Sequence, residues 1–531
     1  MTDMDTCPKC EFGALRPYTP SVDANGLLRS GASPIHICRA SLLDDIVNLE
    51  KELQDIEPLF IQIRDRRNKL LKDLGDCKAL LAPVRTLPPE TLLHIFELAS
   101  SDNDPLEAPW ILGHVCSFWR SLSRSRPSLW TRIYFAAEYC SPEFLEEYIS
   151  LSLDLPIHLF VFEQPDVEDV MVILEGIMMH SERWSTLELK LAGEHIYELL
   201  NLAESPAVQL TKFHISLRVG TRLPKLKREV MSHLFSSSPI QDAYLSRISY
   251  SRMPINPTEL RKFHIFSTPA ELYSMLLHAP HLTELTVTCQ GLRPLTLPPT
   301  YSDVSHTVVR KLSFFVLGEI QESIDNIEFP FGHVTLPALQ EFEILLDERL
   351  RRLLGEIGTL DHSGMVDFLH RSQCNLTTIT LDVPMAVETF LLPILTQSPA
   401  LQKLHVFVNA SVGRDVFEVL VSERGLVQHL KELSIEDLPN PQDKICLFEE
   451  SDALHRMILS RSGSGRCLET LRLSLTPRLW AGKYIPLPVA PDSPLRDLFR
   501  IRDQGMDIKF LFDRKDCLVD EKTRAAFFGS F

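Results

Sequence analysis

The sequence predicts an α/β protein in which a long helix and a small helical module precede a solenoid of strand–helix repeats. Three observations carry this prediction: a heptad repeat of apolar residues over 41–82, two or three short apolar helices over 84–135, and a recurring apolar-x-x-apolar-x-apolar unit from residue 184 onward. We therefore divide the chain into a flexible leader (1–40), a long helix or coiled coil (41–82), the helical module (84–135), a repeat domain (136–512) and a C-terminal tail (513–531).

The composition is that of an ordinary globular protein, with 44% hydrophobic and 24% charged residues among 531. A net charge of −17 argues against a general nucleic-acid or anionic-membrane surface, because both need clustered lysine and arginine. The sequence shows no signal peptide and no apolar run long enough to span a membrane. Eleven irregularly spaced cysteines fit a reducing compartment, which predicts the cytoplasm, the nucleus or both.

The leader contains one pattern with chemical meaning, Cys7-Pro8-Lys9-Cys10. Two thiolates at this spacing supply half of a tetrahedral zinc site. The second half would be His36 and Cys38, whose spacing is poor. We therefore favour a disordered tail with reduced thiols, and we predict no metal and no cofactor.

The segment 41–82 carries apolar residues in alternating steps of four and three from Leu42 to Leu81, which is the heptad pattern of a coiled coil. Arg67 interrupts this seam and Cys77 weakens it, while Pro58 is expected to kink the helix midway. Two interpretations remain open. The seam either makes the protein a dimer or lets a long helix fold back on its own chain.

The helical module begins at Leu87-Pro88-Pro89-Glu90, because proline fits the first turn of a helix and a carboxylate suits the positive end of its dipole. A module of this size, below roughly 60 residues, is marginal alone and must pack on a neighbour, a partner or both. The apolar positions at helical spacing are Leu92, Leu93, Ile95, Phe96 and Ala99 in the first helix, and Leu112, Val115, Cys116, Trp119 and Leu122 on one side of the second.

These residues resemble an F-box, whose pattern is Leu-Pro-x-Glu, an apolar helix, Val-Cys-x-x-Trp and a closing Leu-Trp, here Leu129-Trp130. The resemblance implies docking to the Skp-type adaptor of a cullin ubiquitin ligase. The alternative is that the same side chains are ordinary core of a helical hairpin. The contact residues that the resemblance implies are Leu87, Pro88, Glu90, Leu93, Ile95 and Phe96, with Val115, Cys116 and Trp119 as core and secondary contacts.

From residue 184 the chain repeats one unit, as in Leu210/Phe213/Ile215, Leu282/Leu285/Val287 and Leu401/Leu404/Val406. Copies after Leu260 begin 22 to 38 residues apart, and an amphipathic helix tends to precede each of them. One strand and one helix cannot bury their own apolar face, so neighbouring units must stack on each other. The pattern resembles leucine-rich repeats of an irregular kind. That resemblance implies parallel strands on a concave face and helices outside.

One residue in each unit follows the middle apolar position, and on a strand this residue faces away from the core. Such positions line the concave face of a solenoid, which is the surface that captures partners. A solvated strand surface without a partner is the alternative. The predicted partner-binding residues are Glu188, His214, His264, Thr286, Ser313, Glu343, Thr380, His405 and Arg472.

The sequence holds none of the catalytic or phosphate-binding motifs that we searched for, so we predict no catalytic residues and a non-enzymatic interaction protein. The resemblance implies a substrate-recognition subunit of a Skp–cullin–F-box ubiquitin ligase, with an unidentified target protein held by the repeats. Its effect would be to raise the effective concentration of the target near the transfer chemistry. The rival interpretation is a scaffold, dimeric through 41–82, that acts outside any ligase.

Overall fold

The computed structural model forms two compact units, Met1–Ile95 and Phe96–Phe531, which we describe separately. The group Cys7, Cys10, His36 and Cys38 lies outside the described residues. The structure describes residues 18–30, 39–101, 108–136, 142–162, 175–201, 205–218, 221, 234–235, 237–250, 253, 255–266, 269–290, 303–317, 331–347, 363–382, 387–408, 410–421, 425–437, 452–461, 468–475, 479–480, 483–484, 497–503, 505–512 and 515–516.

The first unit is built on one long helix, α2 (Arg39–Leu80), as the heptad pattern predicts. The helix runs through Pro58 as a single element of 42 residues. It is preceded by α1 (Ala24–Ser30) and followed by the short turn η2 (Pro83–Thr86). The helix α3 (Pro89–Ser101) starts in this unit and continues into the second.

A short N-terminal segment is fastened to α2 through Asp45, a carboxylate that is only 4% exposed. Its oxygens accept hydrogen bonds from the Tyr18 hydroxyl (2.5 Å), the Ser21 hydroxyl (2.9 Å) and the backbone N–H groups of Ser21 and Val22 (both 3.1 Å). The Tyr18 hydrogen bond, followed by those of Ser21, lowers the pKa of Asp45 because each stabilises the ionised form. We call residues 18–22 the N-terminal strap.

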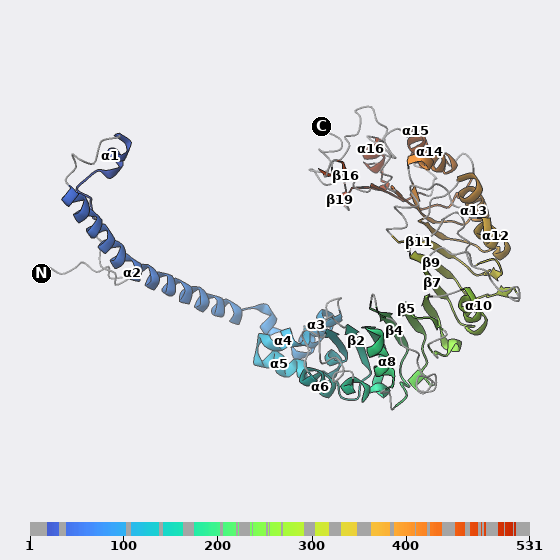
Figure 1. The fold of residues 1–531 in the computed structure, drawn as a ribbon, viewed down its shortest axis with the longest axis horizontal. Helices are drawn as coiled ribbons and strands as arrows, with labels where there is room; N and C mark the ends of the chain where they lie inside the picture. Colours follow the sequence, from blue (N-terminus) through green and yellow to red (C-terminus); the bar gives the residue numbers. More distant parts are fainter. Residues whose placement is uncertain are drawn as a thin grey trace. The chain divides into compact units, whose positions relative to one another are not determined.

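The second unit is dominated by one sheet whose strands follow each other in sequence order (Figure 1). Every neighbouring pair from β1 to β18 is parallel, which confirms the predicted parallel sheet, and only β19 joins it antiparallel. The strands are β1 (Arg132–Ala136), β2 (Ile157–Phe162), β3 (Trp184–Leu191), β4 (Lys212–Leu217), β5 (Asp242–Ser246), β6 (Lys262–Phe266), β7 (Glu284–Gln290), β9 (Lys311–Leu317), β11 (Glu341–Leu346), β12 (Thr378–Leu381), β13 (Lys403–Val408), β14 (Glu432–Asp437), β15 (Thr470–Leu475), β18 (Asp507–Phe512) and β19 (Lys515–Asp516).

The helices that connect the strands lie along one side of this sheet in Figure 1, so the opposite side is a helix-free face among the described residues. Two pairs of two-residue strands lie outside the main sheet: β8 (Val304–Ser305) with β10 (Val334–Thr335), and β16 (Leu479–Trp480) with β17 (Lys483–Tyr484). The helical elements that the structure describes after α3 are α4 (Ala108–Val115), α5 (Ser117–Arg124), η3 (Pro127–Trp130), α6 (Pro142–Leu151), η4 (Ser181–Arg183), α8 (Gly193–Asn201), η6 (Pro257–Glu259), α10 (Pro269–His278), α12 (Ser363–Ser372), η7 (Val387–Leu391), α13 (Leu392–Gln397), α14 (Ala410–Val419), α15 (Asp452–Arg461) and α16 (Asp497–Asp503).

The core of the sheet is a row of apolar side chains that the parallel register aligns from strand to strand. Each is the middle apolar residue of its unit, and each is at most 2% exposed. Burying one such side chain is worth about 1.5–3 kcal/mol, so the row ties successive units together. The row runs Leu187, Phe213, Ala243, Phe263, Leu285, Leu312, Phe342, Ile379, Leu404, Leu433, Leu471 and Ile508.

A glycine in α2 offers a direct test of this helix. Apart from its chain neighbours and the backbone of its own helix, no atom lies within 4 Å of the point where a Cβ would be added to Gly75. Alanine favours a helix interior over glycine by about 0.5–1 kcal/mol, so Gly75→Ala should slow amide hydrogen exchange of the flanking turns about two- to fivefold. The matched variant Ala79→Gly, at another exposed position of α2, should speed that exchange. Unchanged exchange in both variants would contradict a helical segment here.

Candidate functional site

The helical module is built around α3, whose apolar stripe places Leu92 and Phe96 in the core. The Phe96 ring contacts Trp119 of α5, with ring centroids 4.9 Å apart. Glu97 on the next turn accepts hydrogen bonds from Arg126 Nε at 2.7 Å and from the Ser128 hydroxyl at 3.1 Å. These contacts fix the second half of α3 against α5 and η3.

The predicted second helix of the module is two helices, which corrects the single apolar face expected for it. Cys116 adopts an extended conformation, with φ −164° and ψ 169°, and thereby ends α4 and precedes α5. Val115 is consequently 54% exposed instead of lying in the core beside Trp119. The Arg120 guanidinium donates a 2.9 Å hydrogen bond to the Gly113 carbonyl and joins the two short helices.

The predicted adaptor-binding residues fall into three classes of exposure. Phe96 is fully buried, so it supports the fold and offers no contact area, which corrects its assignment as a contact. Leu87, Leu93, Cys116 and Trp119 are half-buried, and Pro88, Glu90, Ile95 and Val115 are exposed.

Sequence reasoning missed three exposed apolar residues of the module: Leu98 (57%), Ile111 (56%) and Phe118 (51%). Their spacing holds a signal, since Leu98 follows Ile95 by three positions and Val115 follows Ile111 by four, which places each pair on one helix face. Large apolar side chains that are exposed together on one helix face are typical of an interaction surface, whereas scattered single ones are not.

The module is anchored to the sheet by a cluster of aromatic rings. Trp130 of η3 is buried and meets Trp110 of α4 edge-on at 5.4 Å and Tyr148 of α6 at 5.0 Å. Phe144 of α6 stacks on Trp110 at 5.5 Å, and the Trp130 indole donates a 2.9 Å hydrogen bond to the Ser123 carbonyl. Because β1 begins two residues after Trp130, the end of the module is the first strand of the sheet.

The helix-free face gathers the nine predicted partner-binding residues into one row. The pairing register aligns Glu188, His214, His264, Thr286, Ser313, Glu343, Thr380, His405 and Arg472 across β3 to β15, with Tyr244 and Ser434 at the same level. Arg472 is exposed and seven others are half-buried. Ser313 is only 2% exposed, because it donates a 2.6 Å hydrogen bond to the carboxylate of Glu343. It is therefore not a contact residue.

A second row, two residues earlier on each strand, is a ladder of opposite charges that sequence reasoning missed. Lys262 pairs with Glu284 at 2.7 Å, Lys311 with Glu341 at 3.4 Å, and Lys403 with Glu432 at 2.7 Å. The sequence contains a pattern that predicts this ladder, because each of these charged residues directly precedes the middle apolar position of its unit. Exposed pairs of this kind contribute about 0–1 kcal/mol each, so their main effect is to hold the register and to neutralise this row.

One part of the helix-free face combines aromatic rings with histidines. Tyr244 lies between His214 and His264, with ring centroids 5.5 and 4.2 Å away, and Phe315 stacks against His264 at 6.3 Å. Further along the same level, Tyr134 and Phe160 stack at 4.2 Å. We call Tyr134, Phe160, His214, Tyr244 and His264 the aromatic row.

Electrostatics differ sharply along the aromatic row. Burial, with a smaller effect of His214, lowers the pKa of His264 to about 4, and its Nε2 lies 2.8 Å from the Thr288 hydroxyl. His214 Nε2 lies 3.3 Å from a carboxylate oxygen of Asp242. Burial opposes ionisation of Asp242, but His214 and two nearby lysines outweigh it and lower its pKa. The surface is thus neutral and aromatic at His264 and polar at His214.

Three aromatic members of this row were not predicted. Tyr244 belongs to a unit in which alanine, Ala243, holds the middle apolar position, and this weakens the repeat pattern there. Tyr134 and Phe160 lie before residue 184, where the repeat pattern in the sequence begins. Strict alternation with the buried Ile133, Phe135, Leu159 and Val161 would have identified both.

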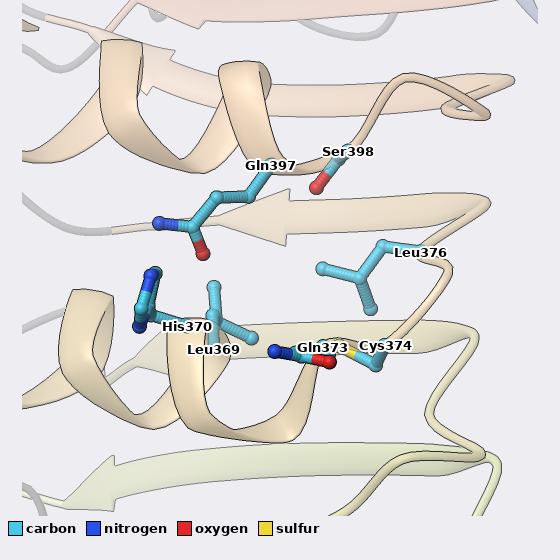
Figure 2. A pocket seen from close by; sticks show the side chains of 7 residues that line it. All are labelled: Leu369, His370, Gln373, Cys374, Leu376, Gln397 and Ser398. Atoms are coloured by element: carbon cyan, nitrogen blue, oxygen red, sulfur yellow. The ribbon is translucent and has the colours of Figure 1, made fainter.

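A pocket of about 280 Å³ lies on the helix side, between the ends of α12 and α13 (Figure 2). Burial raises the pKa of the Cys374 thiol to about 11, so it is protonated at neutral pH and a poor nucleophile. No carboxylate lines the pocket, which leaves it without an acid–base pair. The lining residues are Leu369, His370, Gln373, Cys374, Leu376, Gln397 and Ser398.

Within the described residues, no group of three or more histidine, cysteine or acidic side chains is arranged to hold a metal ion. Among the helices of that part of the chain, none combines the length and the apolar character that crossing a membrane requires.

Comparison with known proteins identifies the helical module. Residues 84–136 match a family model described as F-box-like, which covers α3 to β1 and confirms the predicted resemblance of this segment. The search of curated proteins returned no match to the chain.

The half-buried His264 is expected to make stability depend on pH. Because its folded pKa of about 4 lies below the ordinary 6.5, stability is intact above pH 6.5 and falls as the pH drops from 6.5 towards 4. His264→Phe keeps an aromatic ring against Tyr244 and should remove about 2 kcal/mol of that pH-dependent loss between pH 7 and pH 5. Denaturant unfolding at pH 7 and at pH 5 measures the difference between the variant and the parent. The exposed His281→Phe serves as control, and equal pH dependence of all three proteins would contradict the assignment.

Proposed function

We propose that this chain is the substrate-recognition subunit of a Skp–cullin–F-box ubiquitin ligase. The observation that carries the proposal is the F-box-like match over 84–136, since this family implies a Skp-type adaptor as partner. The helical fold of the module supports it, as do the exposed apolar side chains Leu98, Ile111, Val115 and Phe118, which an adaptor would cover.

The rest of the second unit would hold the target protein. Its parallel strands in sequence order, many of them preceded by a helix, support a leucine-rich-repeat-like solenoid. In such a solenoid the helix-free face captures the partner. The aromatic row is the strongest candidate contact on that face, because half-buried tyrosine and phenylalanine supply large contact area at small entropic cost.

The mechanism would be proximity without catalysis by this chain. The anchoring of Trp130 against Trp110 and Tyr148 couples the end of the module to the sheet, so a target on the sheet would be held at a defined place relative to that part of the module. Rigid placement raises the effective concentration of the target at the transferring subunits. Such a role places the protein in the cytoplasm, the nucleus or both.

The rival function is a scaffold that uses the same module outside a ligase. The exposed seam of α2 favours a role in assembly, but it does not distinguish the two functions. They differ in one consequence. A recognition subunit lowers the abundance of the protein that it captures, whereas a scaffold leaves it unchanged.

Adaptor binding is tested with purified Skp-type adaptor and the full chain. Leu87→Ala/Pro88→Ala removes the opening of the module and should reduce adaptor retention at least tenfold. The control Lys262→Ala/Glu284→Ala, which removes an ion pair of the sheet, should retain the adaptor fully. Retention that is equal in all proteins would show that the opening residues are not the contact, and no binding by the parent would overturn the proposal.

Target capture is tested by comparing proteins bound to the full chain and to Tyr244→Ala/Phe160→Ala, both in the presence of the adaptor. Removal of two half-buried rings from the helix-free face should reduce capture and ubiquitylation of the target about tenfold or more. Leu277→Ala, on the exposed surface of α10, is the matched control and should leave both unchanged. If capture depends on Leu277 and not on the two rings, the target binds the helix side of the sheet, and the proposed site on the helix-free face is wrong.

A further inference from the structure

The long helix α2 leaves most of its apolar seam uncovered by the described residues. Helices of this kind are stable in water chiefly through packing of their apolar face, so a seam this long calls for a partner. The exposed seam residues are Ile46 (49%), Leu49 (38%), Leu53 (66%), Phe60 (60%), Ile63 (51%), Leu70 (61%), Leu74 (51%) and Leu81 (84%).

The N-terminal strap does not occupy the seam. Tyr18 contacts Asp45, Asn48 and Glu52, which follow each other by three and four positions and so lie on one flank of α2. In the heptad of α2, Asp45 and Glu52 occupy g positions, which flank the apolar seam, and Asn48 occupies a c position, which is further from it. The N-terminal strap thus docks next to the seam, and within the described residues the seam is open to another molecule.

The charges of α2 are divided between its two halves. Residues 42–61 hold six acidic residues and one basic residue, whereas residues 62–81 hold six basic and three acidic residues. A second copy in parallel orientation would set like charges against each other over the N-terminal half. A second copy in antiparallel orientation sets the acidic half of each helix against the basic half of the other.

The apolar register agrees with the antiparallel orientation. When Ile46 of one copy lies opposite Cys77 of the other, each of the twelve seam positions from Leu42 to Leu81 lies opposite a seam position of the second copy. Every such layer pairs an a position of one helix with a d position of the other, along the whole overlap. Glu57 then lies beside Arg64 of the second copy. The kink-prone Pro58 occupies an outward position in this arrangement, where it does not disturb the interface.

We propose that α2 pairs with α2 of a second copy of this chain in an antiparallel coiled coil. The overlap is about 60 Å long at 1.5 Å per residue, which is long for a weak encounter. A dimer of this kind carries two helical modules and two sheets. The proposal is independent of the ligase function, since it rests only on the seam and on the charges of α2.

Disulfide cross-linking in the purified full chain tests the orientation. In the antiparallel dimer, Ile46→Cys places a thiol opposite the exposed Cys77 of the second copy, so mild oxidation should link these two positions. Ile46→Cys/Cys77→Ser should lose that link. Peptide mapping identifies the link among those of the other cysteines. A Cys77-to-Cys77 link in the parent would show a parallel dimer and would overturn the proposal.

Charge reversal supplies an independent readout by sedimentation. Glu57→Arg should weaken an antiparallel dimer about five- to tenfold, because each copy then opposes Arg64 of the other with a like charge. Glu57→Arg/Arg64→Glu should restore the affinity, and Asp55→Arg, on the outer surface, should change it little. In a parallel dimer the sign is reversed, since Glu57 would face Glu52 and its reversal would tighten binding. Tighter binding, or a parent that sediments as a monomer at all concentrations, overturns the proposal.

Discussion

The in-register row of buried apolar side chains along the sheet is the constraint on which the second unit depends. Each strand contributes one middle residue, such as Phe213, Leu312 or Leu433, and no unit could bury it alone. Because parallel pairing aligns these residues, it also aligns the residues on either side of them. The order of the core therefore dictates the order of the opposite surface.

This coupling explains why the helix-free face is organised in rows. The charge ladder neutralises itself through pairs such as Lys262 with Glu284, and the Lys311 ammonium also reaches Glu343 at 2.9 Å. Burial opposes the charge of Lys311, but the two glutamates outweigh it and raise its pKa. The aromatic surface of Tyr244 and His264, whose ring centroids lie 4.2 Å apart, remains available for a partner.

Much of this arrangement could be predicted from the sequence, because it depends on periodicity. The long helix, the helical module, the parallel sheet and the shared level of residues such as Glu188 and His405 all follow from the spacing of apolar residues. The sequence-based predictions were wrong where the exposure of a residue depends on a contact with a distant residue, or where one backbone conformation ends a helix. Ser313 is covered by Glu343, thirty positions away. Cys116 interrupts the predicted second helix through its extended backbone conformation, although cysteine is not a residue type that signals a helix end.

The role of Phe96 shows a further limit. Sequence resemblance names the residues of a motif but does not separate those that face a partner from those that pack inside, and Phe96 packs on Trp119. Only the three-dimensional contacts distinguish it from its exposed neighbour Ile95. The same contacts reveal that the module ends inside the sheet as β1, a continuity that a list of motifs does not convey.

The proposed function depends most heavily on the engagement of an adaptor by the helical module. Titration of the purified full chain with a purified Skp-type adaptor, followed by calorimetry, tests this claim most directly. We predict saturable binding with one adaptor for each chain. Absence of heat together with an unchanged sedimentation coefficient at micromolar concentrations would contradict the account and would leave the F-box-like segment as a helical cap on the sheet.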